Sequence, residues 1–220
     1  MKNLQNALLL KQLYQLKVLG YYYTDVKLYK GKEQSELQLP NNLEVLKKQA
    51  SNCHLCSLSK GRYHVVFGEG NSMSEIMFIG DAPLEIEDNE GRPFLGRGGE
   101  MLTAMIEKVL GIPRQNVYIT NLLKCRPLTN QEVHESEFHT CKAYLFKEID
   151  LVKPKVIVTL GEKAYHYLTN DSTALKEIRG SIMKKENYSI VPTYHPNFLL
   201  KNPSLKKEVF LDLKKVKSIL

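Results

Sequence analysis

From about Leu43 onward, short β-branched runs alternate with longer amphipathic segments, and this alternation leaves few folds open. We expect strands over residues 76–79, 117–120, 156–160 and 189–191. Helices are expected over about 98–110, ended by Gly111, and over about 141–152, before Pro154. Strands separated by helices are typical of a parallel sheet covered on both faces. The sequence therefore predicts a three-layer α/β/α fold with a central, mainly parallel four-stranded sheet.

Distinctive polar residues follow three of these strands. Asp81, Asn121 and His195 each come just after an expected strand end. In parallel sheets of this kind, the ligand crevice lies beyond the carboxyl ends of the strands. We therefore expect the three side chains to face one crevice at one edge of the sheet.

The four cysteines are unevenly placed. Cys53 and Cys56 form a C-x-x-C pair, whereas Cys125 and Cys141 lie far downstream. In a reducing compartment they are not expected to form disulfides, so they indicate a metal or cluster site. Four thiolates suit both tetrahedral zinc and an iron–sulfur cluster, although zinc sites more often use two compact pairs.

The length and charge of the chain limit its possible number of domains and its possible partners. The chain has 220 residues, which suits one compact domain with a short appendage. Its formal charge of +7 favours an anionic partner such as nucleic acid, although charge alone does not identify that partner. The early apolar run from Ala7 to Leu10 is too short for a membrane span or a signal peptide. We expect a cytoplasmic protein without a membrane partner.

Residues 1–42 differ from the rest of the chain. Leucines recur there at helical spacing up to Gly20, and a polar stretch resembling a linker follows. We interpret residues 1–42 as an N-terminal helical extension with a linker, and residues 43–220 as the main domain. The extension either docks on that domain or is an arm that contacts another protein or DNA.

Four short motifs follow one another along residues 43–220. They are Gly80-Asp81-Ala82-Pro83 with Glu87-Asp88; Gly91-Arg92-Pro93-Phe94-Leu95-Gly96; Ile119-Thr120-Asn121 with Lys124-Cys125-Arg126-Pro127; and His195-Pro196 with Leu199-Leu200. Together with the cysteines, they resemble the family 4 uracil-DNA glycosylases, which carry a 4Fe–4S cluster. The resemblance implies a DNA-repair enzyme that hydrolyses the glycosidic bond of deoxyuridine in single- or double-stranded DNA and leaves an abasic site. We expect a monomer. It does not extend to residues 1–42.

Three residues have the chemistry that such an enzyme needs for a base flipped out of the stack. Phe94, in a tight loop between Gly91 and Gly96, is the candidate stacking ring. The Asn121 amide can donate to uracil O4 and accept from N3–H, whereas cytosine presents the opposite pattern. His195 is the candidate donor to the negative charge that develops on uracil O2.

The first motif supplies carboxylates. The resemblance implies that Asp81 places the attacking water or balances the cationic sugar, in a position where the family usually has Glu. It also implies that Ala82 contacts the substrate and that Glu87 lies where a thymine methyl group would go. Asp88 is interpreted as a structural partner.

The resemblance assigns Cys53, Cys56, Cys125 and Cys141 as cluster ligands, residue by residue. Candidates for phosphate contacts around the pocket are Arg62, Arg92, Arg97, Lys124 and Arg126. Near the C-terminus, lysines are expected to form the solvated face of a helix with a buried stripe. That stripe is Val209, Phe210, Leu213 and Val216.

The sequence departs from the family pattern at two places. Leu84 stands where the family usually has Gly, which predicts a narrower pocket, a changed substrate or a displaced loop. The loop after Cys125 reads Asn130-Gln131-Glu132-Val133 in place of the family's Asn-Arg-x-Pro pattern, and His134 follows it. Alternatives therefore stay open: a relative that only binds DNA, that traps it covalently or that excises another deaminated base, and a zinc-stabilised interaction protein.

Overall fold

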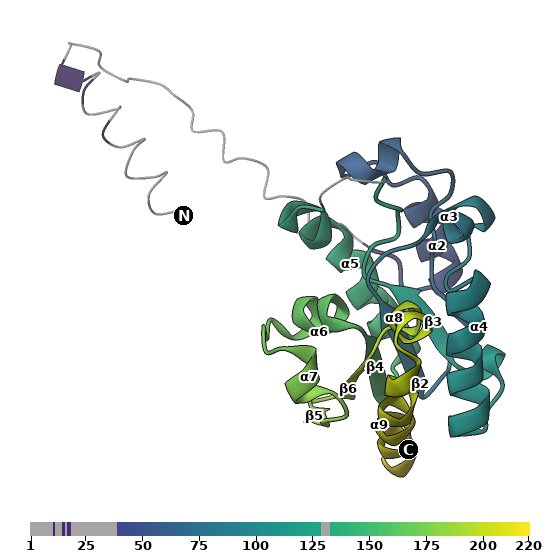
Figure 1. The fold of residues 1–220 in the computed structure, drawn as a ribbon. Helices are drawn as coiled ribbons and strands as arrows, with labels where there is room; N and C mark the ends of the chain where they lie inside the picture. Colours follow the sequence, from purple (N-terminus) through teal and green to yellow (C-terminus); the bar gives the residue numbers. More distant parts are fainter. Residues whose placement is uncertain (1–10, 12–14, 16, 19–38, 129–132) are drawn as a thin grey trace. The chain divides into compact units, whose positions relative to one another are not determined.

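The computed structural model describes residues 11, 15, 17–18, 39–128 and 133–220 (Figure 1). The chain divides into two compact units, residues 1–38 and residues 39–220. In the first unit the four described residues, Lys11, Gln15, Lys17 and Val18, are helical. The leucines of the expected N-terminal helix and the linker after it lie outside the described residues, as do residues 130–132 of the departing loop.

The second unit contains short strands connected mostly by helices. Its strands are β1 (Glu69–Gly70), β2 (Ile76–Gly80), β3 (Tyr118–Asn121), β4 (Val156–Leu160), β5 (Met183–Lys184) and β6 (Ser189–Thr193). Its α-helices are α2 (Leu43–Ser51), α3 (Glu85–Glu90), α4 (Gly96–Met105), α5 (Glu135–Val152), α6 (Glu162–Thr169), α7 (Leu175–Ile178), α8 (Pro196–Lys201) and α9 (Lys206–Ser218). In the described part of the chain, no helix is long and apolar enough to cross a membrane.

The strands form one six-stranded sheet in the order β1-β3-β2-β4-β6-β5. The four central strands are parallel, which confirms the predicted core, and the short edge strands β1 and β5 are antiparallel. The edge strands were not predicted, because two residues are too few for a strand pattern to appear. The register pairs Gly80 with Asn121 and Leu160 with Thr193, so these four strand ends lie at the same edge.

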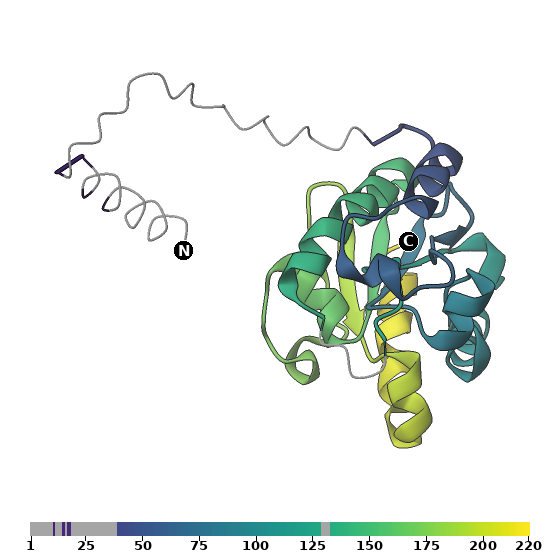
Figure 2. The same cartoon turned by 90° about the horizontal axis from the view of Figure 1, so that it is seen from above.

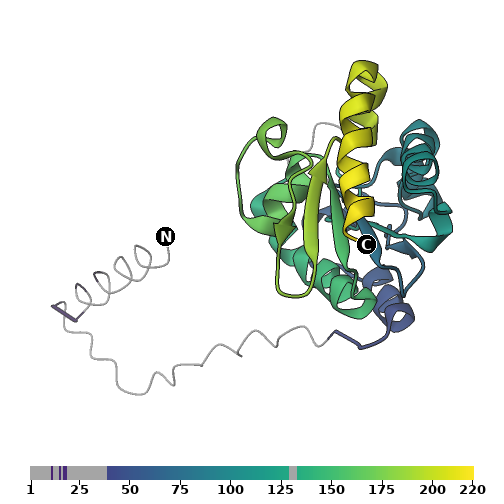
Figure 3. The same cartoon turned by 90° about the horizontal axis from the view of Figure 1, so that it is seen from below.

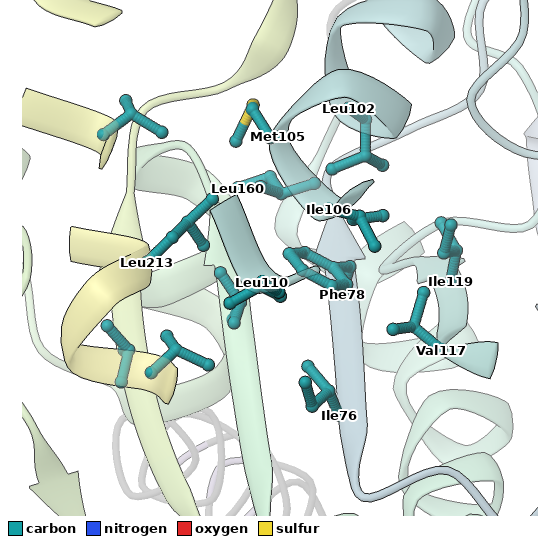
Figure 4. Packing of buried hydrophobic residues seen from close by; sticks show 14 of the residues in the cluster. Ile76, Phe78, Leu102, Met105, Ile106, Leu110, Val117, Ile119, Leu160 and Leu213 are labelled. Atoms are coloured by element: carbon teal, nitrogen blue, oxygen red, sulfur yellow. The ribbon is translucent and has the colours of Figure 1, made fainter. Parts of the chain in front are cut away.

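Helices cover both faces of the sheet, as predicted (Figures 1 and 2). Alternate side chains of each strand point to opposite faces, so Phe78 and Met77 enter different cores. On the first face, α4 and α9 pack against the strands; Figure 3 shows α9 running beside them. In Figure 4, Ile106 lies next to Phe78, and Leu102 lies beyond Ile106 in the same core. On the other face, α5 and α6 bury side chains such as Leu145 and Tyr165.

The predicted helices differ from the observed ones mainly at their beginnings. Helix α4 starts at Gly96 and continues through a π-helical turn to Leu110, where Gly111 ends it with φ +77°. Helix α5 begins at Glu135, six residues before the predicted start. Its first turns carry mostly polar residues, so an apolar pattern did not reveal them.

The buried stripe of α9 differs from the prediction at one position. Val209, Leu213 and Val216 are buried, but Phe210 is 40% exposed. Phe210 is one residue, or 100° of helix rotation, away from Val209, so it points off the buried face. Asp212 takes the remaining inward position, where it accepts hydrogen bonds from Thr193 Oγ1 and Arg179 Nη2.

Candidate active site

A pocket of about 400 Å³ opens at the carboxyl ends of the parallel strands. Asp81, Asn121 and His195 all line it, so the structure brings together the three polar residues that follow strand ends. Ala82, Glu87 and Phe94 line the same pocket. All six residues assigned from the sequence to catalysis or substrate binding therefore meet in one cavity.

Phe94 is held in a constrained loop. Its side chain is buried and its φ is +54°, a conformation that residues other than glycine seldom adopt. Arg114 Nη2 donates to the carbonyl of Pro93 at 2.9 Å, which fixes the residue before it. The Phe94 ring lies 5.6 Å from the His195 ring, centroid to centroid. A fixed aromatic face in a pocket suits a planar base.

Asn121 carries an unpartnered donor. The residue is 1% exposed, and its Nδ2 has no hydrogen-bond partner among the described residues. Its Oδ1 lies over Gly80, where an added Cβ would overlap it and would lie 2.5 Å from the Phe94 Cζ. Gly80 therefore leaves the space that both side chains occupy. A buried donor without a partner is costly, so this geometry favours a ligand that brings an acceptor.

The hydrogen bonds of His195 define its tautomer. The Asn197 main-chain N–H donates to His195 Nδ1 at 3.2 Å, so in the neutral ring the proton lies on Nε2. Burial lowers the pKa of His195 below 6.5, while the nearby Asp81 carboxylate opposes this shift. The distance from His195 Nε2 to Asp81 Oδ1 is 3.8 Å. The ring is thus a neutral donor directed toward the Asp81 side of the pocket.

Glu87 joins the starts of two helices. Its carboxylate accepts from the main-chain N–H of Leu84 at 2.8 Å and from that of Leu95 at 3.3 Å. Burial raises the pKa of this carboxyl group, and these amide donors partly offset the effect. The side chain therefore forms a fixed wall of the pocket next to Phe94.

Three further residues with long or polar side chains also line the pocket. Leu84 lines the pocket and is 48% exposed, so its side chain lies at the opening. Lys163 and Asn197 also line the pocket, and neither was predicted from the sequence. Lys163 comes three residues after β4, at the same carboxyl edge as the other site residues, and that position was the available signal. Asn197 stands two residues after His195.

The four cysteines are free and line one small cavity together with Arg62 and Lys124. Arg62 Nη1 donates to Cys125 Sγ at 3.1 Å, and the Lys124 main-chain N–H donates to Cys141 Sγ at 3.4 Å. In the thiol state, burial raises the pKa of Cys125 and raises that of Cys141 to about 12. Among the described residues, no three His, Cys, Asp or Glu side chains are close enough to hold a single metal ion. Four thiols around one cavity, with N–H donors directed at two sulfurs, have the donor chemistry that an iron–sulfur cluster requires.

The structure corrects one of the proposed phosphate contacts. Lys124 is buried and pairs with Glu148, so its ammonium cannot reach DNA.

The other four candidates are arginines, and Arg62 donates hydrogen bonds to Cys125 Sγ and to the main-chain oxygen of Cys53. Arg126 pairs with Asp88, and Asp88 also accepts from main-chain N–H groups, which confirms Asp88 as a structural partner. Of the other candidates, Arg92 pairs with Glu69 and Arg97 is exposed.

Comparisons with known proteins agree with this geometry. The family model described as "Uracil DNA glycosylase superfamily" matches residues 67–214. A protein of Saccharolobus solfataricus named type-4 uracil-DNA glycosylase is 42% identical over 82% of this chain and 87% of its own length. The proteins of the same name from Sulfurisphaera tokodaii and Thermotoga maritima are 40% and 37% identical, each over 81% of this chain and over 85% and 94% of their own lengths.

Proposed function

Because this chain belongs to the uracil DNA glycosylase superfamily and, within it, to the type-4 uracil-DNA glycosylases, we propose that it is a DNA-repair enzyme that excises uracil. It hydrolyses the N-glycosidic bond of deoxyuridine in DNA, releases uracil and leaves an abasic site. Residues 43–220 carry this activity.

The observation that carries the proposal is the buried, unpartnered Nδ2 of Asn121 in the same pocket as Phe94 and His195. Uracil O4 is the acceptor that this donor lacks, and Asn121 Oδ1 can accept from uracil N3–H. Cytosine offers a donor and an acceptor at the reverse positions, so it would leave both groups of the Asn121 amide unsatisfied. A buried site built to form such bonds discriminates strongly against a base that cannot form them.

In the proposed reaction, His195 stabilises the negative charge that develops on uracil, and Asp81 stabilises the positive charge on the sugar. When the bond between the sugar C1′ and uracil N1 breaks, its electron pair goes to uracil, and negative charge spreads to O2. The neutral His195 ring donates its Nε2–H to O2 without transferring its proton. Asp81, 3.8 Å from that nitrogen, places its carboxylate near the cationic sugar. It orients the water whose oxygen bonds to C1′ and accepts the proton released.

Glu87 is proposed to exclude thymine. Both of its carboxylate oxygens accept main-chain hydrogen bonds, so the side chain cannot swing aside for a 5-methyl group. Ala82, next to Asp81 in the lining, keeps the rest of this wall small. Together these two residues match the pocket to uracil by shape, while Asn121 matches it by hydrogen bonds.

We further propose that Cys53, Cys56, Cys125 and Cys141 hold a 4Fe–4S cluster. When bound, the cluster joins the segment before β1 to the turn after β3 and to α5. Iron and acid-labile sulfide analysis of the purified protein tests this, with zinc measured in the same sample. Iron and sulfide in about a 1:1 ratio, with little zinc, is the expected result. Stoichiometric zinc without iron would contradict it.

Excision from DNA containing one uracil, single-stranded and duplex, tests the main proposal. Removing one donor to a developing anion lowers rates by about 10²–10³-fold, so His195→Ala should reduce kcat by that factor with little effect on KM. His139→Ala, an exposed histidine on α5, is the matched control and should match the wild type. If a protein with its full metal content releases no uracil, the proposal is wrong.

Leu84 at the pocket opening supports one alternative, a changed base preference. Thymine, cytosine and hypoxanthine substrates in the same assay test it. Faster release of another base than of uracil would favour the alternative, and Leu84→Gly should then shift the preference back to uracil.

A further inference from the structure

The pair formed by Lys124 and Glu148 is buried and has no part in the reaction described above. The two side chains are 3% and 0% exposed. An ammonium group has three N–H donors, and Lys124 has an acceptor for each. It donates to the Glu148 carboxylate, to Thr120 Oγ1 at 2.6 Å and to the main-chain oxygen of Asn121 at 2.8 Å. The pair therefore contacts the main chain of the residue that is proposed to recognise uracil.

Two further hydrogen bonds fix the carboxylate of Glu148. Its Oε1 accepts from the main-chain N–H of Gly68 at 3.0 Å and from the Tyr118 hydroxyl at 3.0 Å. The carboxylate thus joins α5 to β3 and to the segment before β1. Its position is fixed independently of Lys124.

Lys124 also lies beside the cysteine site. Its main-chain N–H donates to Cys141 Sγ at 3.4 Å, and Cys125 is the next residue. Glu148 follows Cys141 by seven residues, which is two helical turns, so both lie on one face of α5. Lys124 therefore contacts the cysteine site through its main chain and Asn121 through its side chain.

Stability alone does not require a charge at this position. Removing two charges from water is costly, and replacing a buried ion pair by apolar residues of similar size is often neutral or stabilising. What the pair provides is one directional hydrogen bond, from Lys124 Nζ to the main-chain oxygen of Asn121. The Asn121 side chain branches from this main chain, so a shift of the main chain would move the unpartnered Nδ2 with it.

We infer that Lys124 is a positioning residue that fixes Asn121 relative to the cysteine site, so that recognition of uracil depends on the buried Lys124–Glu148 pair. This inference rests on the proposed function. It assigns Lys124 a role in base discrimination, in place of the phosphate contact expected from the sequence.

The test uses the double variant Lys124→Met with Glu148→Leu in the full chain. A single substitution would leave one buried charge unpaired and would destabilise the fold, whereas the double variant removes both charges. Tyr118→Phe is the matched control, because it removes one hydrogen bond to Glu148 and leaves every Lys124 contact in place.

The readout is base discrimination in binding, measured apart from catalysis. The dissociation constant is compared for DNA carrying one 2′-fluorodeoxyuridine, which resists cleavage, and for the same DNA carrying 2′-fluorodeoxycytidine, whose base presents the reverse donor and acceptor to Asn121. We expect the double variant to lose at least about tenfold of the wild-type preference, because a small misplacement of a recognition group has effects of this size. Its unfolding midpoint should fall, because the Gly68 N–H and the Tyr118 hydroxyl lose their acceptor, whereas its metal content should stay close to that of the wild type. Tyr118→Phe should keep the preference.

A folded double variant with the wild-type preference overturns the inference. If the double variant does not fold, Lys124→Arg decides, because it keeps the charge but changes the geometry toward Asn121. A reduced preference in Lys124→Arg supports the inference, and an unchanged one overturns it. A wild-type protein without any preference for uracil would instead contradict the proposed function.

Discussion

At the scale of single residues, the site depends on atoms that are left without a partner or without a proton. Asn121 Nδ2 has no partner among the described residues, and Nδ1 of His195 accepts from a main-chain N–H. The first feature prepares the pocket for an acceptor on the substrate. The second makes Nε2 the donor without any need for a positive charge.

The lowered pKa of His195 predicts how the stability and the activity of the protein change at acidic pH. Burial holds the folded-state pKa below 6.5, so the unfolded chain binds this proton more readily. The stability that the neutral ring contributes is complete above pH 6.5 and is lost as the pH falls toward the folded-state pKa. Activity should fall with it, because a protonated Nδ1 becomes a donor that faces the Asn197 N–H.

Measuring kcat and the unfolding midpoint between about pH 8 and about pH 5 checks this expectation. His195→Gln is the comparison, since it has no imidazole to titrate. The acid-side loss of stability near the His195 pKa should be absent from the variant. An identical loss in both proteins would assign it to another group.

Gly80 provides a second test at the same scale. The Cβ of Gly80→Ala would overlap Asn121 Oδ1 and approach the Phe94 ring, so one of these side chains must move. We expect kcat/KM for uracil excision to fall by about 10²-fold, because small displacements in a catalytic site have effects of this size. Single-turnover kinetics with metal analysis measures it. Gly91→Ala is the control: its φ of +67° makes that substitution strained too, but the nearest atoms to its Cβ belong to His64.

At the scale of secondary-structure elements, the geometry of the pocket depends more on the residues where helices begin than on the rest of each helix. The main-chain N–H of Leu84 precedes α3 and that of Leu95 precedes α4, and Glu87 accepts from both. Because Phe94 stands directly before Leu95, this carboxylate also sets the position of the stacking ring. The strained φ of Phe94 persists because the chain is held on both sides.

Glu87→Gln tests this connection. Its amide keeps one acceptor but turns an NH₂ group toward the second N–H, which leaves a buried donor unsatisfied. We expect the free energy of unfolding to fall by about 1–3 kcal/mol, measured by urea denaturation, and kcat/KM to fall as Phe94 loses its fixed position. Glu85→Gln, an exposed residue of the same helix, should change neither quantity. Wild-type stability in Glu87→Gln would show that Glu87 does not hold the two helix starts.

At the scale of the whole molecule, charge is unevenly placed around the pocket. The chain carries a formal charge of +7, yet Asp81 and Glu87 place two carboxylates in the pocket lining. Among the described lining residues, Lys163 is the single cation. Because the backbone of DNA is anionic, we expect Lys163 to contact a phosphate close to the flipped nucleotide.

The salt dependence of binding measures that contact. For Lys163→Gln, the slope of log affinity against log salt concentration should be shallower by about 0.7–0.9, the value for one lost phosphate contact. Single-stranded DNA with one 2′-fluorodeoxyuridine is a suitable probe. Lys217→Gln, on α9 and outside the pocket lining, should keep the wild-type slope. Equal slopes for Lys163→Gln and the wild type would place Lys163 away from the phosphates.

The local pattern of the sequence was enough to predict the core of the fold. Runs such as Ile76–Gly80 and Val156–Leu160 are almost entirely apolar because both faces of these strands are buried, so their interpretation needs no distant partner. The strand order places polar residues that follow such runs at one edge, and Asp81, Asn121 and His195 meet there for that reason. The order of the motifs along the chain added Phe94, Glu87 and the cysteines to the predicted site residues.

Tertiary contacts decided which charged side chains are buried and which line the pocket, because the local sequence pattern does not contain this information. Lys124 is buried because Glu148, 24 residues later, compensates its charge, and no local pattern predicts that partner. Asp212 points inward and Phe210 outward because Thr193 and Arg179 satisfy the carboxylate. Lys163 joins the pocket because β4 lies next to β2 and β6 in the sheet. Residue types and their spacing thus determined which chemistry is present, whereas pairing across the fold determined which charges are buried and which face the substrate.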